Sequence, residues 1–229
     1  MPDRCLLYYI TDRSEFRGDE PARRPALLAK VAEAARAGVD YIQLREKDLS
    51  TRELEMLAQE ALTAIRNSTP LRTENRELRT SLRTRLLINS RTDVALAAGA
   101  DGVHLRADDV TPHEVRQVVE FSGPHALTGE HFVIATSCHS VADVFRAESD
   151  KVDFAVFAPV FGKRGAAGTP TGLAGLHEAC RGKIPVVALG GVTTENAASC
   201  LTAGAAGVAG VRLFQENKIE DVVRALRAL

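Results

Sequence analysis

Features that mark several protein classes are absent from this sequence. No run of apolar residues approaches the roughly 20 that cross a bilayer, and the start of the chain shows no signal h-region followed by a cleavage site. The cysteines, Cys5, Cys138, Cys180 and Cys200, are widely separated, and no C-x-x-C pair occurs. We therefore expect no membrane partner, no disulfide or zinc framework, and a reducing cytoplasm as the location.

An excess of charge of either sign is also absent. The 29 basic and 30 acidic residues leave a formal net charge of −1, so nothing favours a nucleic acid or an acidic membrane as partner. What is present is the ordinary composition of a globular protein, with 45% hydrophobic and 26% charged residues. The 229 residues suit a single α/β barrel domain spanning 1–229.

Short apolar runs bounded by turn residues recur along the chain and have the composition of buried parallel strands. Ala-rich segments with helical spacing lie between them, and Gly38, Gly99 and Gly204 follow such segments where a helix C-cap needs a positive φ. This alternation of strand and helix predicts a (β/α)8 TIM barrel. A doubly wound open sheet is the second choice, but it typically carries a Gly-rich dinucleotide turn that this sequence lacks. The expected strands are Leu6–Thr11, Tyr41–Arg45, Leu86–Asn89, Gly102–Leu105, Phe132–Ser137, Phe154–Ala158, Pro185–Leu189 and Gly207–Val211.

Three connections between these elements are unusual. The polar, Arg-rich stretch of about 66–85 precedes a strand, so we expect an insertion on the N-terminal face of the barrel, away from the chemistry. The stretches Asp12–Pro25 and Gly162–Gly172 follow strands, so they are expected on the catalytic face, where they could act as lids.

The second expected strand carries a polar face. Because side chains alternate along a strand, Gln43, Arg45 and Lys47 share one side and are expected to point into the barrel and toward its rim. Burying such cations without a partner is costly, and a phosphate would satisfy them. The alternative is that acidic side chains neutralise them, with Glu46, Asp108 and Asp109 as the candidates.

Glycines at the end of the seventh strand favour a phosphate site. Gly190 and Gly191 allow backbone N–H groups to approach a ligand, and in many barrels the loops after strands seven and eight bind phosphate. Val211 and Arg212 end the eighth strand, so they are expected at the same place. Arg212 could equally point to solvent.

Two further strand ends carry candidate catalytic groups. Asp108 and Asp109 could hold Mg²⁺ that bridges phosphate oxygens, or the segment could simply cap the helix that begins at Pro112. His139 could be a general acid or base, or could cap the next helix or hydrogen-bond the backbone. His104, inside a strand, is expected to be a core histidine with its hydrogen bonds satisfied.

The motifs together resemble the thiamine phosphate synthase/thiazole tautomerase family from about Tyr8 to Leu213. The resemblance implies a (β/α)8 barrel that joins hydroxymethylpyrimidine diphosphate to thiazole phosphate, giving thiamine phosphate and pyrophosphate with Mg²⁺. The segments that carry it are Tyr9–Asp12, Ile42–Lys47, Ala100–Leu105, Ala158–Phe161, Ala188–Val192 and Ala203–Ala209.

The resemblance also implies roles for single residues. Ser137 matches a pyrimidine-side contact, Asn89 a polar group at the end of the third strand, and Asp109 a metal ligand helped by Asp108. Arg45 and Lys47 match diphosphate contacts, and with Ser137 and His139 they form the expected catalytic set. The substrate-binding set is Gln43, Asn89, Lys163, Arg164, Gly190, Gly191, Val211 and Arg212.

Departures from the family pattern keep two other functions open. Ser90 stands where the synthase usually has a metal-binding Asp, and Lys163 and Arg164 keep the charge of an anion clamp but lose its hydroxyls. A tautomerase would isomerise a thiazole carboxylate phosphate without metal, with His139 as acid and base. A non-catalytic thiamine phosphate binder would also need no metal at Ser90. A homo-oligomer is left open by the sequence.

Overall fold

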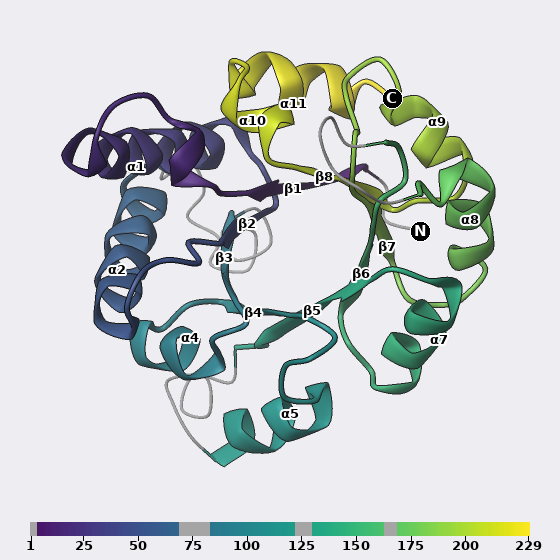
Figure 1. Cartoon of the computed structure of the whole chain (residues 1–229), viewed down its shortest axis with the longest axis horizontal. Helices are drawn as coiled ribbons and strands as arrows, with labels where there is room; N and C mark the ends of the chain where they lie inside the picture. Colours follow the sequence, from purple (N-terminus) through teal and green to yellow (C-terminus); the bar gives the residue numbers. More distant parts are fainter. Residues whose placement is uncertain (1–3, 69–82, 122–129, 163–168) are drawn as a thin grey trace, which may run out of the picture.

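The computed structural model describes residues 4–68, 83–121, 130–162 and 169–229. Its eight parallel strands form a closed barrel in the order β1 to β8, and β8 pairs with β1 (Figure 1). Helices surround the barrel, seen in Figure 1 as an outer ring. The predicted (β/α)8 fold is therefore confirmed.

Each predicted strand is present, and five of the eight end one residue earlier than expected, whereas the strand expected over Phe132–Ser137 runs from Val133 to Cys138. At Arg45, directly after the second strand, the backbone N–H donates to the Thr11 hydroxyl at 3.0 Å. The strands are β1 Leu6–Ile10, β2 Tyr41–Leu44, β3 Arg85–Asn89, β4 Gly102–Leu105, β5 Val133–Cys138, β6 Phe154–Phe157, β7 Val186–Ala188 and β8 Gly207–Gly210.

The helices of the described residues follow the strands in turn. Gly38 and Gly99 end α1 and α4 with φ values of 84° and 68°, which confirms two of the three predicted C-caps; the helix before Gly204 has Ala203 as its C-cap instead. The bounds are η1 Arg13–Glu15, α1 Glu20–Ala37, α2 Thr51–Ser68, α4 Thr92–Ala98, α5 Pro112–Phe121, α7 Val141–Ser149, α8 Gly172–Ala179, α9 Ala197–Thr202, α10 Arg212–Gln215 and α11 Ile219–Arg227.

Two expectations about connections are corrected. The stretch Asp12–Pro25 is not one loop, because α1 already begins at Glu20 and includes Pro25. The expected 66–85 insertion is shorter at both ends. Helix α2 runs to Ser68, and Arg85 opens β3. Residues 69–82, like Lys163 and Arg164 of the anion-binding prediction, lie outside the described part of the chain.

Two apolar cores lie on the two sides of the barrel wall. Outward-facing strand residues such as Ile42, Leu44 and Ile88 pack against the helices in the larger core. Inward-facing residues form the smaller core, which fills the barrel. Its members are Tyr8, Ile10, Leu87, Val133, Ala135, Phe154, Val156, Val187 and Ala209. This alternation follows the two-residue period of a strand, and it fixes which side chains can reach the barrel mouth.

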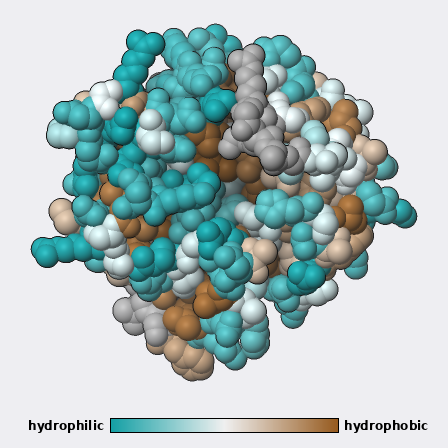
Figure 2. All heavy atoms as spheres, viewed as in Figure 1, coloured by the Kyte–Doolittle hydropathy of each residue, from teal (hydrophilic) through white to brown (hydrophobic). Residues whose placement is uncertain are grey.

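The face of the molecule seen in Figure 2 differs in character between its middle and its rim. Hydrophobic side chains gather near the middle, and hydrophilic ones dominate around it. No helix of the described residues has both the length and the apolar character needed to span a membrane.

Candidate active site

Polar side chains lie on the inner side of the barrel near the C-terminal ends of β2 to β5. Gln43 is buried, and its Nε2 donates to Asn89 Oδ1 at 2.8 Å. Asn89 Nδ2 in turn donates to the Ser90 hydroxyl at 3.1 Å. Since the strand neighbours of Gln43 belong to the outer core, its amide must face the barrel interior. The structure thus brings Gln43 and Asn89 together as one hydrogen-bonded pair.

A second polar chain crosses the same interior. Tyr8 Oη lies 3.0 Å from His104 Nδ1, and His104 Nε2 lies 2.8 Å from Ser137 Oγ. Tyr8 and His104 are buried, whereas Ser137 is partly exposed. His104 is a satisfied core histidine as predicted, but it also touches a predicted site residue. Sequence reasoning missed Tyr8, although its inward register on β1 was a usable signal.

The protonation states of this chain follow from burial. Desolvation, helped by the positive charge of Arg45, lowers the pKa of His104 to about 3, so its imidazole is neutral near pH 7. Desolvation also raises the pKa of Tyr8 well above its usual value, so its phenol keeps its proton. The hydrogen-bonded side chains of Tyr8, His104 and Ser137 are therefore all uncharged near pH 7.

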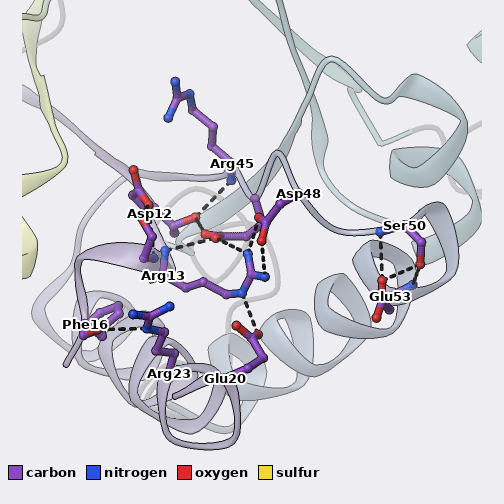
Figure 3. A network of polar contacts seen from close by, with 12 residues as sticks. Asp12, Arg13, Phe16, Glu20, Arg23, Arg45, Asp48, Ser50 and Glu53 are labelled. Atoms are coloured by element: carbon purple, nitrogen blue, oxygen red, sulfur yellow. Dashed lines mark hydrogen bonds and ion pairs between the residues drawn. The ribbon is translucent and has the colours of Figure 1, made fainter. Parts of the chain in front are cut away.

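The two predicted cations of the second strand lie just beyond its end. Arg45 is half-buried, and its guanidinium makes no ion pair or side-chain hydrogen bond within the described residues. Lys47 is exposed. Figure 3 shows the Arg45 side chain directed away from the neighbouring ion-pair network. A half-buried cation without a protein partner is suited to bind an anionic ligand.

An ion-pair network centred on the buried Arg13 and Glu46 anchors the loop that holds these cations (Figure 3). Arg13 Nη1 contacts Glu46 Oε2 at 3.1 Å, and the guanidinium also binds Asp48 at 2.7 Å and Glu20 at 2.7 Å. The Thr11 hydroxyl donates to Glu46 Oε1 at 2.6 Å. The ion-pair partner of Glu46 is therefore Arg13 and not Arg45, which one hypothesis from the sequence had allowed. Sequence reasoning missed Arg13, whose partners Glu46 and Asp48 lie 33 and 35 residues away along the chain.

The charges within this network shift one another's pKa values. Burial raises the pKa of Glu46, although hydrogen bonds from Thr11 and Arg13 oppose the shift. Hydrogen bonding to the Arg13 guanidinium lowers the pKa of Asp48. The same carboxylates, Asp48 foremost, raise the pKa of Arg13 far beyond any working pH, so Arg13 is always charged.

The predicted metal ligands form a small turn. Asp109 Oδ2 accepts from the backbone N–H of Arg106 at 2.7 Å, and Asp108 binds the Arg106 guanidinium at 2.8 Å. The cap of α5 comes from Thr111, which exchanges hydrogen bonds with Glu114. Within the described residues no group of three or more His, Cys, Asp or Glu side chains could hold a metal ion.

His139 lies exposed at the end of β5. Its Nδ1 donates to the carbonyl of Ala158 at 2.8 Å, which links the ends of β5 and β6. The cap of α7 comes instead from the neighbouring Ser140, whose hydroxyl accepts from Asp143 N at 3.2 Å. The backbone hydrogen bond that the sequence left open is therefore present, and a catalytic role stays a prediction.

The glycine pair after β7 packs closely against the loop after β6. A Cβ on Gly190 would come within 2.7 Å of Pro159 Cα, and one on Gly191 within 2.8 Å of Phe161 Cβ. Both residues have positive φ, which favours glycine. Within the described residues their backbone N–H groups donate to no partner, so these groups remain available to a ligand.

The loop after β8 reaches toward the loop after β1. Val211 precedes the short helix α10, and Arg212 opens it. Arg212 Nε lies 3.6 Å from Glu15 Oε2 of η1, and its side chain is 46% exposed. The guanidinium is therefore held loosely at the rim, where both solvent and a ligand could reach it.

Sequence comparisons connect this site with a known enzyme group. Residues 7–214 match the family model described as thiamine monophosphate synthase. A thiamine-phosphate synthase of Methanoculleus marisnigri is 37% identical over 225 residues, which cover 96% of this chain and 93% of the relative. A thiamine-phosphate synthase of Clostridium novyi is 33% identical over 226 residues, which cover 97% and 96% respectively.

Solved structures agree with these sequence matches. Thiamine phosphate pyrophosphorylase from Pyrococcus furiosus aligns with a TM-score of 0.73 and 26% identity, over 97% of this chain and 94% of that one. A 3-hexulose-6-phosphate synthase aligns with a TM-score of 0.62 at 16% identity. The second likeness shows the barrel fold alone.

Proposed function

This chain belongs to the thiamine monophosphate synthase family, and we propose that it joins hydroxymethylpyrimidine diphosphate to thiazole phosphate, releasing pyrophosphate. The reaction class is that of a transferase. One observation carries the proposal. Arg45, whose guanidinium makes no ion pair or hydrogen bond within the described residues, stands at the barrel mouth. Beside it lie two inward-facing hydrogen-bonded pairs, Gln43–Asn89 and His104–Ser137. Such an arrangement can bind a flat heterocycle by its polar edge and a diphosphate by its charge.

The proposed roles follow from position. Gln43, Asn89 and Ser137 bind the pyrimidine, while Arg45 and Lys47 bind its diphosphate. The backbone N–H groups of Gly190 and Gly191, together with the backbone at Val211, bind the thiazole phosphate. Arg212 adds positive charge to this second subsite. Lys163 and Arg164 keep their predicted role as anion-binding groups.

The chemistry asks mainly for positioning and charge stabilisation. As diphosphate leaves, its negative charge grows, and Arg45 is already placed to stabilise it without a competing protein carboxylate. The thiazole nitrogen carries its own lone pair, so its attack needs no general base. The barrel holds the two substrates so that nitrogen and carbon meet.

We include Mg²⁺ in the proposal. Asp109 and Asp108 would hold it with help from the substrate's phosphate oxygens, because Mg²⁺ often needs only one or two protein carboxylates. The oxygen donors of this turn fit that preference, although Arg106 competes for both carboxylates. When bound, the ion would neutralise part of the diphosphate charge. The cytoplasm remains the proposed location.

The test is pyrophosphate release. Purified protein receives pyrimidine diphosphate, thiazole phosphate and Mg²⁺, with omission of the thiazole phosphate as the control. We expect turnover only when both substrates are present, with thiamine phosphate as the product. Absence of release, together with isomerisation of a thiazole carboxylate phosphate, would instead identify a tautomerase. Binding of thiamine phosphate without any turnover would identify a non-catalytic binder.

A further inference from the structure

Three side chains from strands distant in sequence form one hydrogen-bond chain inside the barrel. They are Tyr8 of β1, His104 of β4 and Ser137 of β5, joined by contacts of 3.0 Å and 2.8 Å. The rings of Tyr8 and His104 also lie against each other, with centroids 5.8 Å apart. Only Ser137, at the outer end of the chain, is partly exposed. The chain therefore leads from the barrel core to the proposed substrate.

The direction of the hydrogen bonds follows from counting donors. The Tyr8 phenol is fully buried, and within the described residues its sole hydrogen-bond partner is His104 Nδ1. If Nδ1 carried the imidazole proton, the buried Tyr8 O–H would have no acceptor, at a cost of roughly 1–3 kcal/mol. Tyr8 therefore donates to Nδ1, and the proton of the neutral imidazole lies on Nε2.

We propose that Tyr8 and His104 are positioning residues that fix Ser137 as a hydrogen-bond donor to the substrate. His104 Nε2–H donates to Ser137 Oγ, which occupies one lone pair of the hydroxyl. Within the described residues the Ser137 hydroxyl has no further hydrogen-bond partner, so its hydrogen points to the ligand. Neither Tyr8 nor His104 touches substrate, since both are buried behind Ser137.

This inference rests on the proposed function and specifies the substrate atom that Ser137 recognises. As a donor, Ser137 binds an acceptor atom of the pyrimidine diphosphate and not its exocyclic amino group. Because the His104 imidazole stays neutral far below pH 7, the donors and acceptors of these hydrogen bonds do not change around neutral pH. His104 has Tyr8 and Ser137 as hydrogen-bond partners, and Arg45 is the charged group that acts on it. The positive charge of Arg45 further disfavours protonation of the imidazole.

Nitrogen NMR of protein labelled with ¹⁵N-histidine tests the direction without any need for activity. The His104 signals, assigned by comparison with His104→Gln, should show a protonated Nε2 and an unprotonated, hydrogen-bonded Nδ1. In Tyr8→Phe, which keeps the ring but removes the donor, the Nδ1 signal should move to that of a free acceptor or mix with the other tautomer. A protonated Nδ1 in the wild type would overturn the inference.

Kinetics supply the second readout, with a matched control in the next residue. Tyr9 is equally buried, but its hydroxyl has no hydrogen-bond partner among the described residues. We expect Tyr8→Phe to lower kcat by about fivefold to tenfold, and to lose more thermal stability than Tyr9→Phe because it leaves the buried His104 Nδ1 without its donor. Tyr9→Phe should keep the wild-type kcat. Equal kcat values in the two variants would contradict the proposal.

Two variants of His104 test whether the residue acts by its hydrogen bond to Ser137 or only by filling space in the core. In His104→Gln the amide nitrogen can replace Nε2 as donor to Ser137, whereas the shorter amide of His104→Asn cannot reach it. The Gln variant should therefore retain several times more kcat than the Asn variant, and an equal loss would overturn the proposal. If the wild type releases no pyrophosphate, the proposed function has failed, and the NMR result alone decides the inference.

Discussion

At the scale of single residues, the charged groups of the site differ in what holds them. Arg13 binds three carboxylates, and Asp109 is fixed by the backbone of Arg106. Arg45 has no comparable partner within the described residues. A desolvated cation without a counter-ion gains most when an anion arrives. We therefore associate Arg45 with ligand binding, and Arg13 and Asp109 with the shape of the loops.

Ser90 offers the sharpest test of the metal proposal. Its φ is 61°, a conformation that Asp tolerates better than most residues, and its backbone N–H donates to His104 O at 2.8 Å. Ser90→Asp should fold normally and tighten Mg²⁺ binding by at least the ~10-fold that changing even an outer-shell partner produces. The required Mg²⁺ concentration for half-maximal rate should fall in parallel.

Calorimetric Mg²⁺ titrations with and without a diphosphate analogue measure this change. Ser140→Asp is the matched control, because it adds a carboxylate at another strand end and keeps a good helix N-cap. Equal Mg²⁺ affinity in wild type and Ser90→Asp would show that position 90 does not face the metal.

His139 separates the synthase from the tautomerase. The reaction proposed for this chain needs no base at this position, and the cap of α7 comes from Ser140, so His139→Ala should keep the rate within about threefold. Ser137→Ala should cost about tenfold to 100-fold through the lost substrate hydrogen bond. Pyrophosphate release measures both. A collapse in His139→Ala with unchanged substrate affinity would favour an acid–base role.

At the scale of elements, three loops on one face of the barrel are fastened to one another. The loop after β1 is joined to the loop after β2 through Arg13 and Glu46. It is joined to α10 through Asp12, whose backbone exchanges hydrogen bonds with the Gln215 side chain at 2.8 Å and 3.0 Å. A segment anchored at two points is not a freely moving lid, so this part of the lid prediction is not supported.

Removing the centre of this anchor should be costly. Arg13→Met keeps most of the side-chain volume but leaves the buried Glu46 carboxylate without its cation, so we expect a loss of about 3–5 kcal/mol in the free energy of unfolding. The double variant with Glu46→Gln should recover much of this loss. Urea unfolding provides the measurement.

The control for this prediction is an exposed ion pair. Arg181, whose side chain is 66% exposed, contacts Glu178 at 3.0 Å, and Arg181→Met should change stability by less than about 1 kcal/mol. Similar small losses in both single variants would mean that the Arg13 network is no stronger than a surface pair.

At the scale of the whole molecule, a polar chain runs through the inner core of the barrel. His104 has a pKa of about 3 in the folded state, against an ordinary histidine value of 6.5, and this difference couples folding to pH. Between these values the unfolded chain binds a proton that the folded chain does not. Stability contributed by His104 is therefore complete above pH 6.5 and is lost as the pH falls toward 3.

The predicted signature is a difference between two stability profiles. Below pH 6.5, wild type should lose stability more steeply than His104→Gln, by up to about 1.4 kcal/mol per pH unit. Urea unfolding at several pH values measures both curves, and the remaining histidines and carboxylates contribute equally to each. Parallel curves would show that His104 titrates normally in the folded protein.

The barrel and its polar strand ends could be predicted from the sequence because they depend on local patterns. Alternating strand and helix segments, glycine C-caps and the two-residue strand period need no knowledge of distant contacts. They led to the fold and to Gln43, Arg45 and Lys47 as candidates, whereas Ser137 came from the family resemblance. The bounds of α1 and α2 were missed, because Pro25 and the polar end of α2 resemble loop sequence.

Tertiary structure alone decided which groups are partners. Arg13 meets Glu46 across 33 positions, and Tyr8 meets His104 across 96, because barrel closure brings distant strand ends together. It also assigned Glu46 to Arg13 and left Arg45 available to a ligand. Hydrogen bonding and desolvation act through distances in space, whereas strand and helix patterns act between neighbours along the chain. For that reason the sequence determined the barrel and the candidate residues, and folding determined their pairings and protonation states.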